Sequence, residues 1–252
     1  MSYDEIVFKN LDFDNMPAIV CFKNNIKHAP LIVFSHGFKG NKECFREEMV
    51  KYARNDFFTV SIDNKGHGDR NDTPFFEYAM KDKKLNILKV RELINETAKE
   101  IPGLIDLLEN DGRVDCRRTG MAGYSMGGFI TYRAMMLENR IKAAAPFISS
   151  PAWNEFPRNV PVVDDIELRR QLKEYSEKNS PVNFPEKFYD RNILIQIGKN
   201  DNHFNIENVR LFVDKVNEHS ADKIRLIEYD NVAHDVTIEM KETAFDWLKK
   251  VL

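Results

Sequence analysis

Cysteine is scarce in this sequence, and long apolar runs are absent. The three cysteines, Cys21, Cys44 and Cys116, lie far apart, with no Cys-x-x-Cys spacing and no histidine cluster nearby. Isolated thiols in an odd number predict reduced side chains that are buried or idle, which fits a cytoplasmic protein. No stretch approaches the roughly 18 consecutive apolar residues that a membrane-spanning helix needs, so none is predicted.

An excess of positive charge is also missing. The formal net charge is −3 at pH 7, which leaves no basic surface to attract nucleic acid. The first residues, MSYDEIVFKNLDF, include acidic side chains and alternate apolar with polar positions. Because no basic segment precedes an apolar one there, the sequence predicts no signal peptide. These absences favour a soluble protein without a nucleic-acid or membrane partner.

Strand-like and helix-like segments alternate along the 252 residues, a length that suits one α/β domain or two small ones. Apolar patterns predict strands at 6–13, 17–23, 29–37, 57–63, 118–125, 141–149, 192–198 and 223–230. Amphipathic spacing predicts helices at 41–55, 85–110, 126–137, 205–219 and 236–252. We expect the first two strands to pair antiparallel and the others to form parallel βαβ units, with helices on both faces of the sheet.

One segment interrupts this alternation. Residues 150–190 separate two predicted strands, contain five prolines and several aromatic side chains, and include a predicted helix from Asp165 to Lys178. A connection this long is typical of an insertion with a function, which predicts a lid or cap. The alternative is an excursion that packs against the body of the domain without covering a site.

The most informative stretch is GYSMGG, residues 123–128, where a predicted strand becomes a predicted helix. In a parallel sheet this junction lies at the carboxyl edge, where ligands bind. A nucleophile there needs a very tight turn, and Gly123 and Gly127 allow it because larger side chains would collide with neighbouring backbone. The dipole of the following helix favours negative charge nearby. These features predict that Ser125 is a nucleophile, and the alternative is a glycine-flanked turn that happens to contain a serine.

A serine hydroxyl needs a general base near neutral pH. Of the six histidines, His234 lies in the loop NVAHDVT after the last predicted strand, which opens at the same edge as Ser125, and it is the predicted base. The base needs an acid that holds its tautomer. Asp201 follows the strand at 192–198 and is the predicted acid, with a helix N-cap as its alternative role. The order Ser125, Asp201, His234 is the one expected for an α/β-hydrolase fold.

Four motifs in this order resemble those of the α/β-hydrolase superfamily, and the resemblance covers nearly the whole chain. They are HGFKG, DNKGHGD, GYSMGG, and GKND with VAHD. The resemblance implies a mostly parallel sheet of about eight strands with helices on both faces, in one domain of residues 1–252 with 150–190 as a small lid. FSHGFKGNKE and the compact length resemble single-domain esterases and acyl-hydrolases related to the prolyl-oligopeptidase and dienelactone-hydrolase groups. The serine nucleophile departs from the cysteine of dienelactone hydrolases.

The resemblance also implies an oxyanion hole made of two backbone amides. They are the N–H of Phe38, in the loop after the third strand, and the N–H of Met126, which follows the nucleophile. His36 would then shape that loop, and His67 in GHG would have a structural role. Lys65 stands where many relatives have arginine, which leaves the mechanism untouched but alters local loop contacts.

The implied activity is that of a serine hydrolase cleaving small to medium carboxylic esters through an acyl-enzyme, with no metal or organic cofactor and a small-molecule ester as its partner. A thioesterase, an amide hydrolase and a non-catalytic binding protein of the same fold remain alternatives. The aromatic residues of the insertion are expected either to wall the acyl pocket or to form a satellite core. They are Trp153, Phe156, Phe184, Phe188 and Tyr189.

Overall fold

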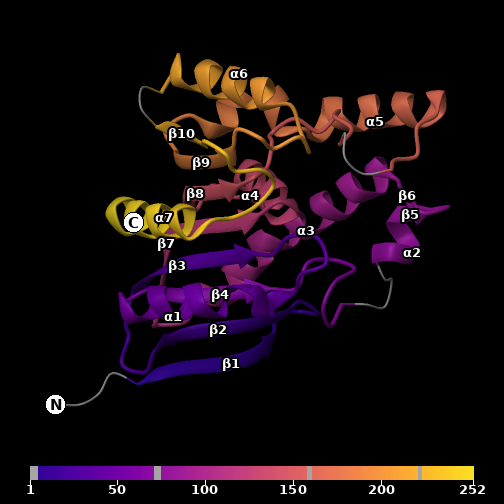
Figure 1. The fold of residues 1–252 in the computed structure, drawn as a ribbon. Coiled ribbons are helices and arrows are strands. Elements are labelled where there is room, and N and C mark those ends of the chain that lie inside the picture. The colour runs from indigo at the N-terminus through magenta and orange to yellow at the C-terminus, as the bar shows by residue number, and fades with distance from the viewer. Residues whose placement is uncertain (1–4, 71–74, 158–160, 221–222) are drawn as a thin grey trace.

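Ten strands are present in the residues that the computed structural model describes, which are 5–70, 75–157, 161–220 and 223–252. Their bounds are Ile6–Asp12 (β1), Pro17–Lys23 (β2), Ala29–Ser35 (β3), Phe58–Ile62 (β4), Met80–Lys81 (β5), Lys84–Leu85 (β6), Val114–Tyr124 (β7), Ile141–Phe147 (β8), Asn192–Gly198 (β9) and Ile224–Tyr229 (β10). Eight of them form one sheet in the order β1-β2-β4-β3-β7-β8-β9-β10, and β5 pairs with β6 (Figure 1). The predicted sheet of about eight strands is confirmed.

The direction of the strands also follows the prediction. β1 pairs antiparallel with β2, and β2 pairs antiparallel with β4. From β4 through β3, β7, β8 and β9 to β10, neighbouring strands are parallel. The carboxyl ends of these six strands therefore meet at one edge of the sheet, which is where an α/β sheet binds ligands.

The helices confirm the predicted alternation with strands. Their bounds are Arg46–Arg54 (α1), Phe75–Ala79 (α2), Ile87–Leu108 (α3), Met126–Leu137 (α4), Ile166–Asn179 (α5), Ile206–Asn217 (α6) and Ile238–Val251 (α7), with short 3-10 turns at Lys42–Phe45, Pro181–Asn183 and Pro185–Phe188. None of these described helices has the length and apolarity needed to cross a bilayer.

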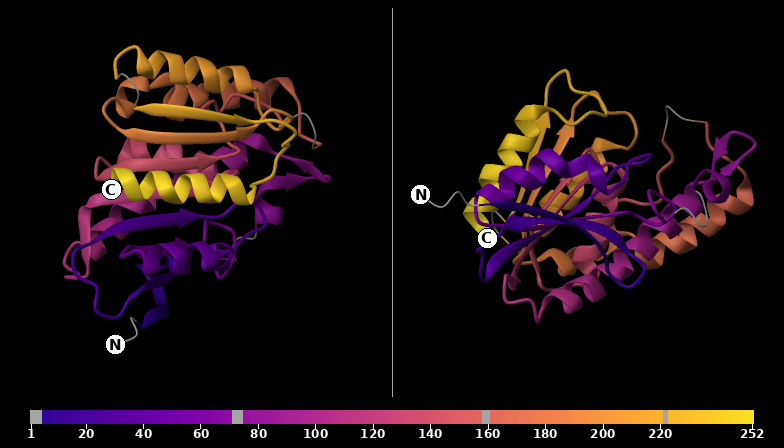
Figure 2. Two further views of the ribbon diagram at one scale, coloured as in Figure 1. Left: turned by 60° about the vertical axis from the view of Figure 1, so that its left-hand side comes forward. Right: turned by 90° about the horizontal axis from the view of Figure 1, so that it is seen from below.

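Two hydrophobic cores lie on opposite faces of the sheet. Leu31 and Val33 of β3 pack into the core that holds α3, α4 and α6, whereas Ile32 and Phe34 pack into the core that holds α1 and α7. The views in Figure 2 show these two sets of helices on opposite sides of the strands. Because both faces of β3 are buried, its sequence is a continuous apolar run rather than an alternating one.

The sequence did not predict the structure of residues 75–85. They form α2 and the small hairpin of β5 and β6 where only a polar loop was expected. Residues 161–163 of the long insertion join this hairpin, since Leu85 N–H donates to the Pro161 carbonyl at 2.8 Å and Val163 N–H donates to the Leu85 carbonyl at 2.9 Å. The same insertion carries α5, whose Tyr175 hydroxyl lies 2.9 Å from the Asn95 side-chain amide of α3.

The turn from β7 into α4 depends on very close backbone packing. A Cβ atom added to Gly127 would lie 1.8 Å from the Ser35 carbonyl oxygen at the end of β3. A Cβ atom on Gly123 would lie 2.2 Å from the carbonyl oxygen of Gly127 itself. The prediction that larger side chains would collide here is confirmed, and β3, β7 and α4 can meet only if both positions lack a side chain.

Replacing Gly127 by alanine should therefore lower the free energy of unfolding by about 3 kcal/mol, because the atoms in conflict belong to rigid backbone. Gly103→Ala is the matched control, since Gly103 lies within α3 and none of the described neighbours comes within 4 Å of its added Cβ. That control should be stabilised by about 0.5–1 kcal/mol through helix propensity. Urea unfolding of both variants measures the difference, and equal stability of the two would contradict this account.

Candidate active site

Ser125 lies between the end of β7 and the start of α4 in a strained conformation. Its φ is 51° and its ψ is −112°, which is uncommon for a residue with a side chain. Its N–H donates to the Phe147 carbonyl at 3.0 Å, and its own carbonyl accepts from Phe129 N–H at 3.1 Å. Strain of this kind persists where surrounding structure enforces it, and it is concentrated at functional sites. It turns the side chain away from both the strand and the helix.

Three side chains that the sequence singled out lie in one hydrogen-bonded row. The Ser125 Oγ atom lies 2.7 Å from His234 Nε2, and His234 Nδ1 lies 2.7 Å from Asp201 Oδ2. A carboxylate can only accept, so Nδ1 of His234 carries the proton and Nε2 is left to accept from the serine hydroxyl. This is the arrangement in which an imidazole can take the proton of a serine.

Asp201 is buried at the end of this row. Burial alone would raise the pKa of its carboxyl, but hydrogen bonds from His203 and His234 outweigh that effect and lower the pKa to about 2. Asp201 is thus an anion at neutral pH. A buried anion next to His234 holds the imidazole in one tautomer and stabilises the imidazolium that would form after proton transfer.

Two loops must approach closely to join His234 to Asp201. Asn200 N–H in the loop after β9 donates to the Val232 carbonyl in the loop after β10, at 2.9 Å. A Cβ atom on Gly198, the last residue of β9, would lie 2.2 Å from that same carbonyl oxygen. The absence of a side chain at position 198 therefore lets the loop with the histidine pass over the end of the strand with the aspartate.

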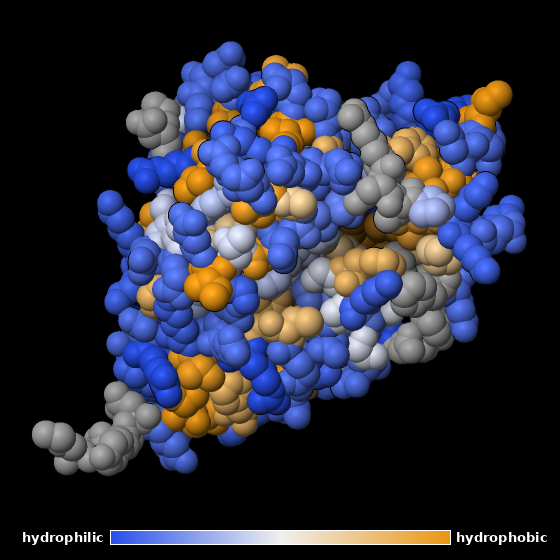
Figure 3. Space-filling view, viewed as in Figure 1, coloured by the Kyte–Doolittle hydropathy of each residue, from blue (hydrophilic) through white to orange (hydrophobic). Residues whose placement is uncertain are grey.

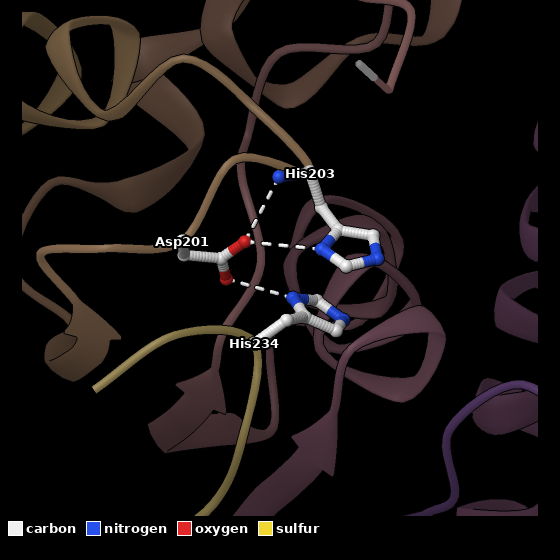
Figure 4. A group of neighbouring side chains, drawn as sticks. All are labelled: Asp201, His203 and His234. Atoms are coloured by element: carbon white, nitrogen blue, oxygen red, sulfur yellow. Dashed lines mark hydrogen bonds and ion pairs between the residues drawn. The ribbon is translucent and has the colours of Figure 1, made fainter. Parts of the chain in front are cut away.

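His203 is a member of the site to which the sequence assigned no role. Its backbone N–H donates to Asp201 Oδ1 at 2.9 Å, and its ring Nδ1 lies 3.2 Å from the same oxygen. Its ring also stacks on that of His234, with centroids 3.7 Å apart and planes inclined by 29° (Figure 4). Asp201 therefore contacts two imidazoles with its two oxygens. The sequence did contain a signal for this role, since His203 follows the predicted acid by two residues. A turn of that length brings the backbone N–H of the histidine back to the carboxylate.

Asp201, His203 and His234 also form a group with the chemistry to hold a metal ion, since their ligand atoms lie within 4.8 Å of one another. A tetrahedral zinc ion with bonds of 2.0–2.1 Å would hold its ligand atoms roughly 3.3 Å apart. The 2.7 Å between His234 Nδ1 and Asp201 Oδ2 is shorter than this and is the length of a charge-assisted hydrogen bond. The geometry thus fits a hydrogen-bonded row better than a metal centre.

The loop after β3 lies on the other side of Ser125 and is held by His36. Nδ1 of His36 donates to the Gly37 carbonyl at 2.7 Å, and Nε2 accepts from Asn64 N–H at 3.1 Å. Burial lowers the pKa of His36 to about 4, so the ring is neutral with both nitrogens engaged. These contacts agree with the prediction that His36 shapes the loop. Lys65, which stands where the resemblance leads one to expect arginine, forms an ion pair of 2.9 Å with Glu100.

A cavity of about 340 Å³ opens at Ser125. Its lining includes Phe38 and Met126, the residues predicted to supply the oxyanion hole, together with Ser125, His203 and His234. Apolar side chains form much of the remaining wall: Leu85, Ile87, Val90, Ile94, Phe129 and Pro157. In Figure 3, hydrophobic colours reach the surface in a hollow on the right of the molecule, over α3, on a face that is otherwise largely hydrophilic.

The aromatic residues of the insertion do not form this wall. Trp153 is fully buried and stacks on Tyr175, and Phe188 is fully buried against Tyr132 and Phe212. These contacts support the satellite-core alternative for those two residues. Much of the cavity wall comes from α3 and α4 instead, and the sequence did not show that the amphipathic helix α3 faces the site.

The order of the strands and the strained serine after β7, with an aspartate after β9 and a histidine after β10, define the class of the protein. It is a serine hydrolase of the α/β-hydrolase superfamily. Residues 5–187 match the acetyl xylan esterase (AXE1) family, and the chain belongs to this family. It is thus a hydrolase that acts on ester bonds. The matched residues include Ser125 and end before Asp201 and His234.

Several relatives match along nearly the whole length of this chain. The chain is 26% identical over 261 residues to "Putative esterase YitV" of Bacillus subtilis (strain 168), covering 98% of this chain and 100% of that protein. The structure of TT1662 from Thermus thermophilus matches with a TM-score of 0.79 at 17% identity over 98% of both chains. Acetyl xylan esterase 1 from Thermoanaerobacterium sp. JW/SL YS485 matches with a TM-score of 0.69 at 14% identity, covering 99% of this chain and 88% of that one. At sequence identities of 17% and 14%, similarity to these two solved structures establishes the fold alone.

The lowered pKa of Asp201 has a consequence for stability in acid. Because the folded pKa of about 2 lies below the usual aspartate value of 3.8, ionised Asp201 contributes stability that is fully present above about pH 4. That contribution, at most roughly 2.5 kcal/mol, should be lost as the pH falls from about 4 to about 2. The measurement is the difference in unfolding free energy between wild type and Asp201→Asn from pH 6 to pH 2. If the difference in unfolding free energy stays constant from pH 6 to pH 2, the pKa of the Asp201 carboxyl is not lowered in the folded protein.

Proposed function

We propose that the protein hydrolyses carboxylic esters of small to medium acyl groups, with Ser125 as nucleophile, His234 as general base and Asp201 as the acid that orients it. The observation that carries this proposal is the continuous row of hydrogen bonds, each 2.7 Å long, from the strained serine to the buried carboxylate. Acetyl esters are the first substrates to test, because the family is named for acetyl xylan esterase.

The proposed reaction has two halves. Ser125 Oγ attacks the ester carbonyl while its proton passes to His234 Nε2, and the alcohol leaves as His234 returns that proton to it. Water then attacks the acyl-enzyme with His234 again as base, which releases the acid. We assign the oxyanion to the backbone N–H groups of Phe38 and Met126. Both residues line the cavity at Ser125, and Met126 is the first residue of α4, where the helix dipole favours negative charge.

Two further features belong to this proposal. Residues 150–190 act as a cap in one domain of residues 1–252, which is supported by Pro157 in the cavity wall and by the backbone bonds between 161–163 and Leu85. The protein works in the cytoplasm with reduced thiols. In support, Cys21, Cys44 and Cys116 are unpaired, and burial raises the thiol pKa of Cys21 and of Cys116 to about 11.

Ser125→Ala should abolish labelling by a fluorophosphonate and lower kcat on 4-nitrophenyl acetate by roughly 10⁴-fold or more, because the covalent step is removed. Ser149→Ala is the matched control, since Ser149 is a fully buried serine whose hydroxyl has no hydrogen-bond partner among the described residues. The control should label like wild type. Intact mass and peptide mapping locate the adduct, and an adduct on any residue other than Ser125 would overturn the assignment.

Two histidine variants separate chemistry from structure. His234→Ala should lower kcat by several orders of magnitude with an unchanged melting temperature, because residues of such a row act as a unit. His67→Ala should lower the melting temperature more than the rate per folded molecule, because His67 contacts the His36 ring and lies 3.0 Å from the Lys65 carbonyl through Nδ1. Active-site titration corrects for the folded fraction. Equal catalytic losses in both variants would show that His67 has been misassigned.

A further inference from the structure

Arg91 of α3 is a buried cation in the wall of the cavity at Ser125. Only 6% of its surface is exposed, yet it lines the same cavity as Ser125 and Phe129. Its Nε donates to the Trp153 carbonyl at 3.2 Å, and its guanidinium carbon lies 4.3 Å from the centre of the Phe129 ring. The two Nη atoms, with four N–H groups, have no hydrogen-bond partner in the part of the protein that the structure describes.

The other buried arginines of the described residues differ in this respect. Arg133 donates from Nε to the Asn95 side chain at 2.8 Å and from Nη2 to the Asn179 side chain at 3.0 Å. Arg191 uses both Nη atoms, including a bond of 3.2 Å to the Glu138 carbonyl. Neither lines the cavity. Arg91 thus has Nη donors without a partner among the described residues, and it lines the cavity at Ser125.

No carboxylate compensates the charge of Arg91 at ion-pair distance within the described residues. Burial lowers the pKa of Arg91 to about 10, an effect that the field of Glu155 opposes, so the guanidinium remains protonated at neutral pH. The oxygens of Glu155 are themselves engaged by Asn205 N–H at 2.9 Å and by the Asn208 amide. A buried cation without a counterion is costly, and a neutral donor would suffice to hold the Trp153 carbonyl.

Apart from Arg91, Ser125 and the two histidines, the residues that line the cavity are apolar. Side chains such as Ile87, Val90 and Ile94 suit a chain of methylene groups. A planar guanidinium fork recognises a carboxylate through two parallel hydrogen bonds. On the basis of the proposed function, we propose that Arg91 selects esters whose acyl chain ends in a carboxylate, the monoesters of short dicarboxylic acids. The ester carbonyl then lies at Ser125 and the distal carboxylate at Arg91.

The test compares two methyl esters with six-carbon acyl chains, monomethyl adipate and methyl hexanoate, by pH-stat at constant ionic strength. The ratio of kcat/KM for adipate to that for hexanoate should exceed one in wild type. Arg91→Met should lower this ratio by roughly ten- to hundred-fold, because a hydrogen-bonded charge pair is lost. Arg91→Lys should retain part of the preference. Arg133→Met, which removes a buried arginine that does not line the cavity, should leave the ratio at its wild-type value.

The outcomes separate this proposal from the one on which it rests. A wild-type ratio below one would overturn the role of Arg91, and so would an Arg91→Met variant that loses both activities by the same factor. If Arg91→Met does not fold, the wild-type ratio and the Arg91→Lys variant still decide the question. Failure of Ser125→Ala to abolish methyl hexanoate hydrolysis would refute the proposed function instead, whichever ratio is found.

Discussion

The approach of α4 to β3 is the constraint on which the site depends. Contact between the Gly127 backbone and the Ser35 carbonyl fixes how the chain leaves β7, and Ser125 adopts its positive φ as a result. The same end of β3 leads into the loop that His36 holds against Asn64. One close contact therefore positions both the proposed nucleophile and the loop that carries Phe38. The cost of the strained serine is met by the stability of the two cores on either side of the sheet.

Much of the fold could be predicted because its signals are local. β3 is a continuous apolar run, which is typical of a strand that is buried on both faces. Ser125 was predictable from its two flanking glycines, and His234 and Asp201 from their places after consecutive strands. All three lie within one hydrogen-bonded row, although their catalytic roles stay a proposal. The carboxyl ends of parallel strands meet at one edge of the sheet, so residues far apart in the sequence lie close together there. For this reason the three residues could be predicted without knowledge of their contacts.

The features that the sequence did not reveal arise from packing between distant elements. Arg91 reads as one polar position of an amphipathic helix, and nothing local shows that it is buried against Trp153. Its sequence neighbours Val90 and Ile94 read as core residues although they line the cavity. The stacking of His203 on His234 joins two separate loops. Such features depend on how helices and loops are placed over the sheet, which periodicity alone does not encode.

The bonds between Leu85 and residues 161–163 make two excursions from the sheet into one mechanical unit. Leu85 from the hairpin and Pro157 from the insertion both lie in the cavity wall. The hairpin and the insertion can move apart only if these two backbone hydrogen bonds break. The hairpin and the insertion therefore form a joint part of the cavity wall, although they leave the sheet at points far apart in the chain.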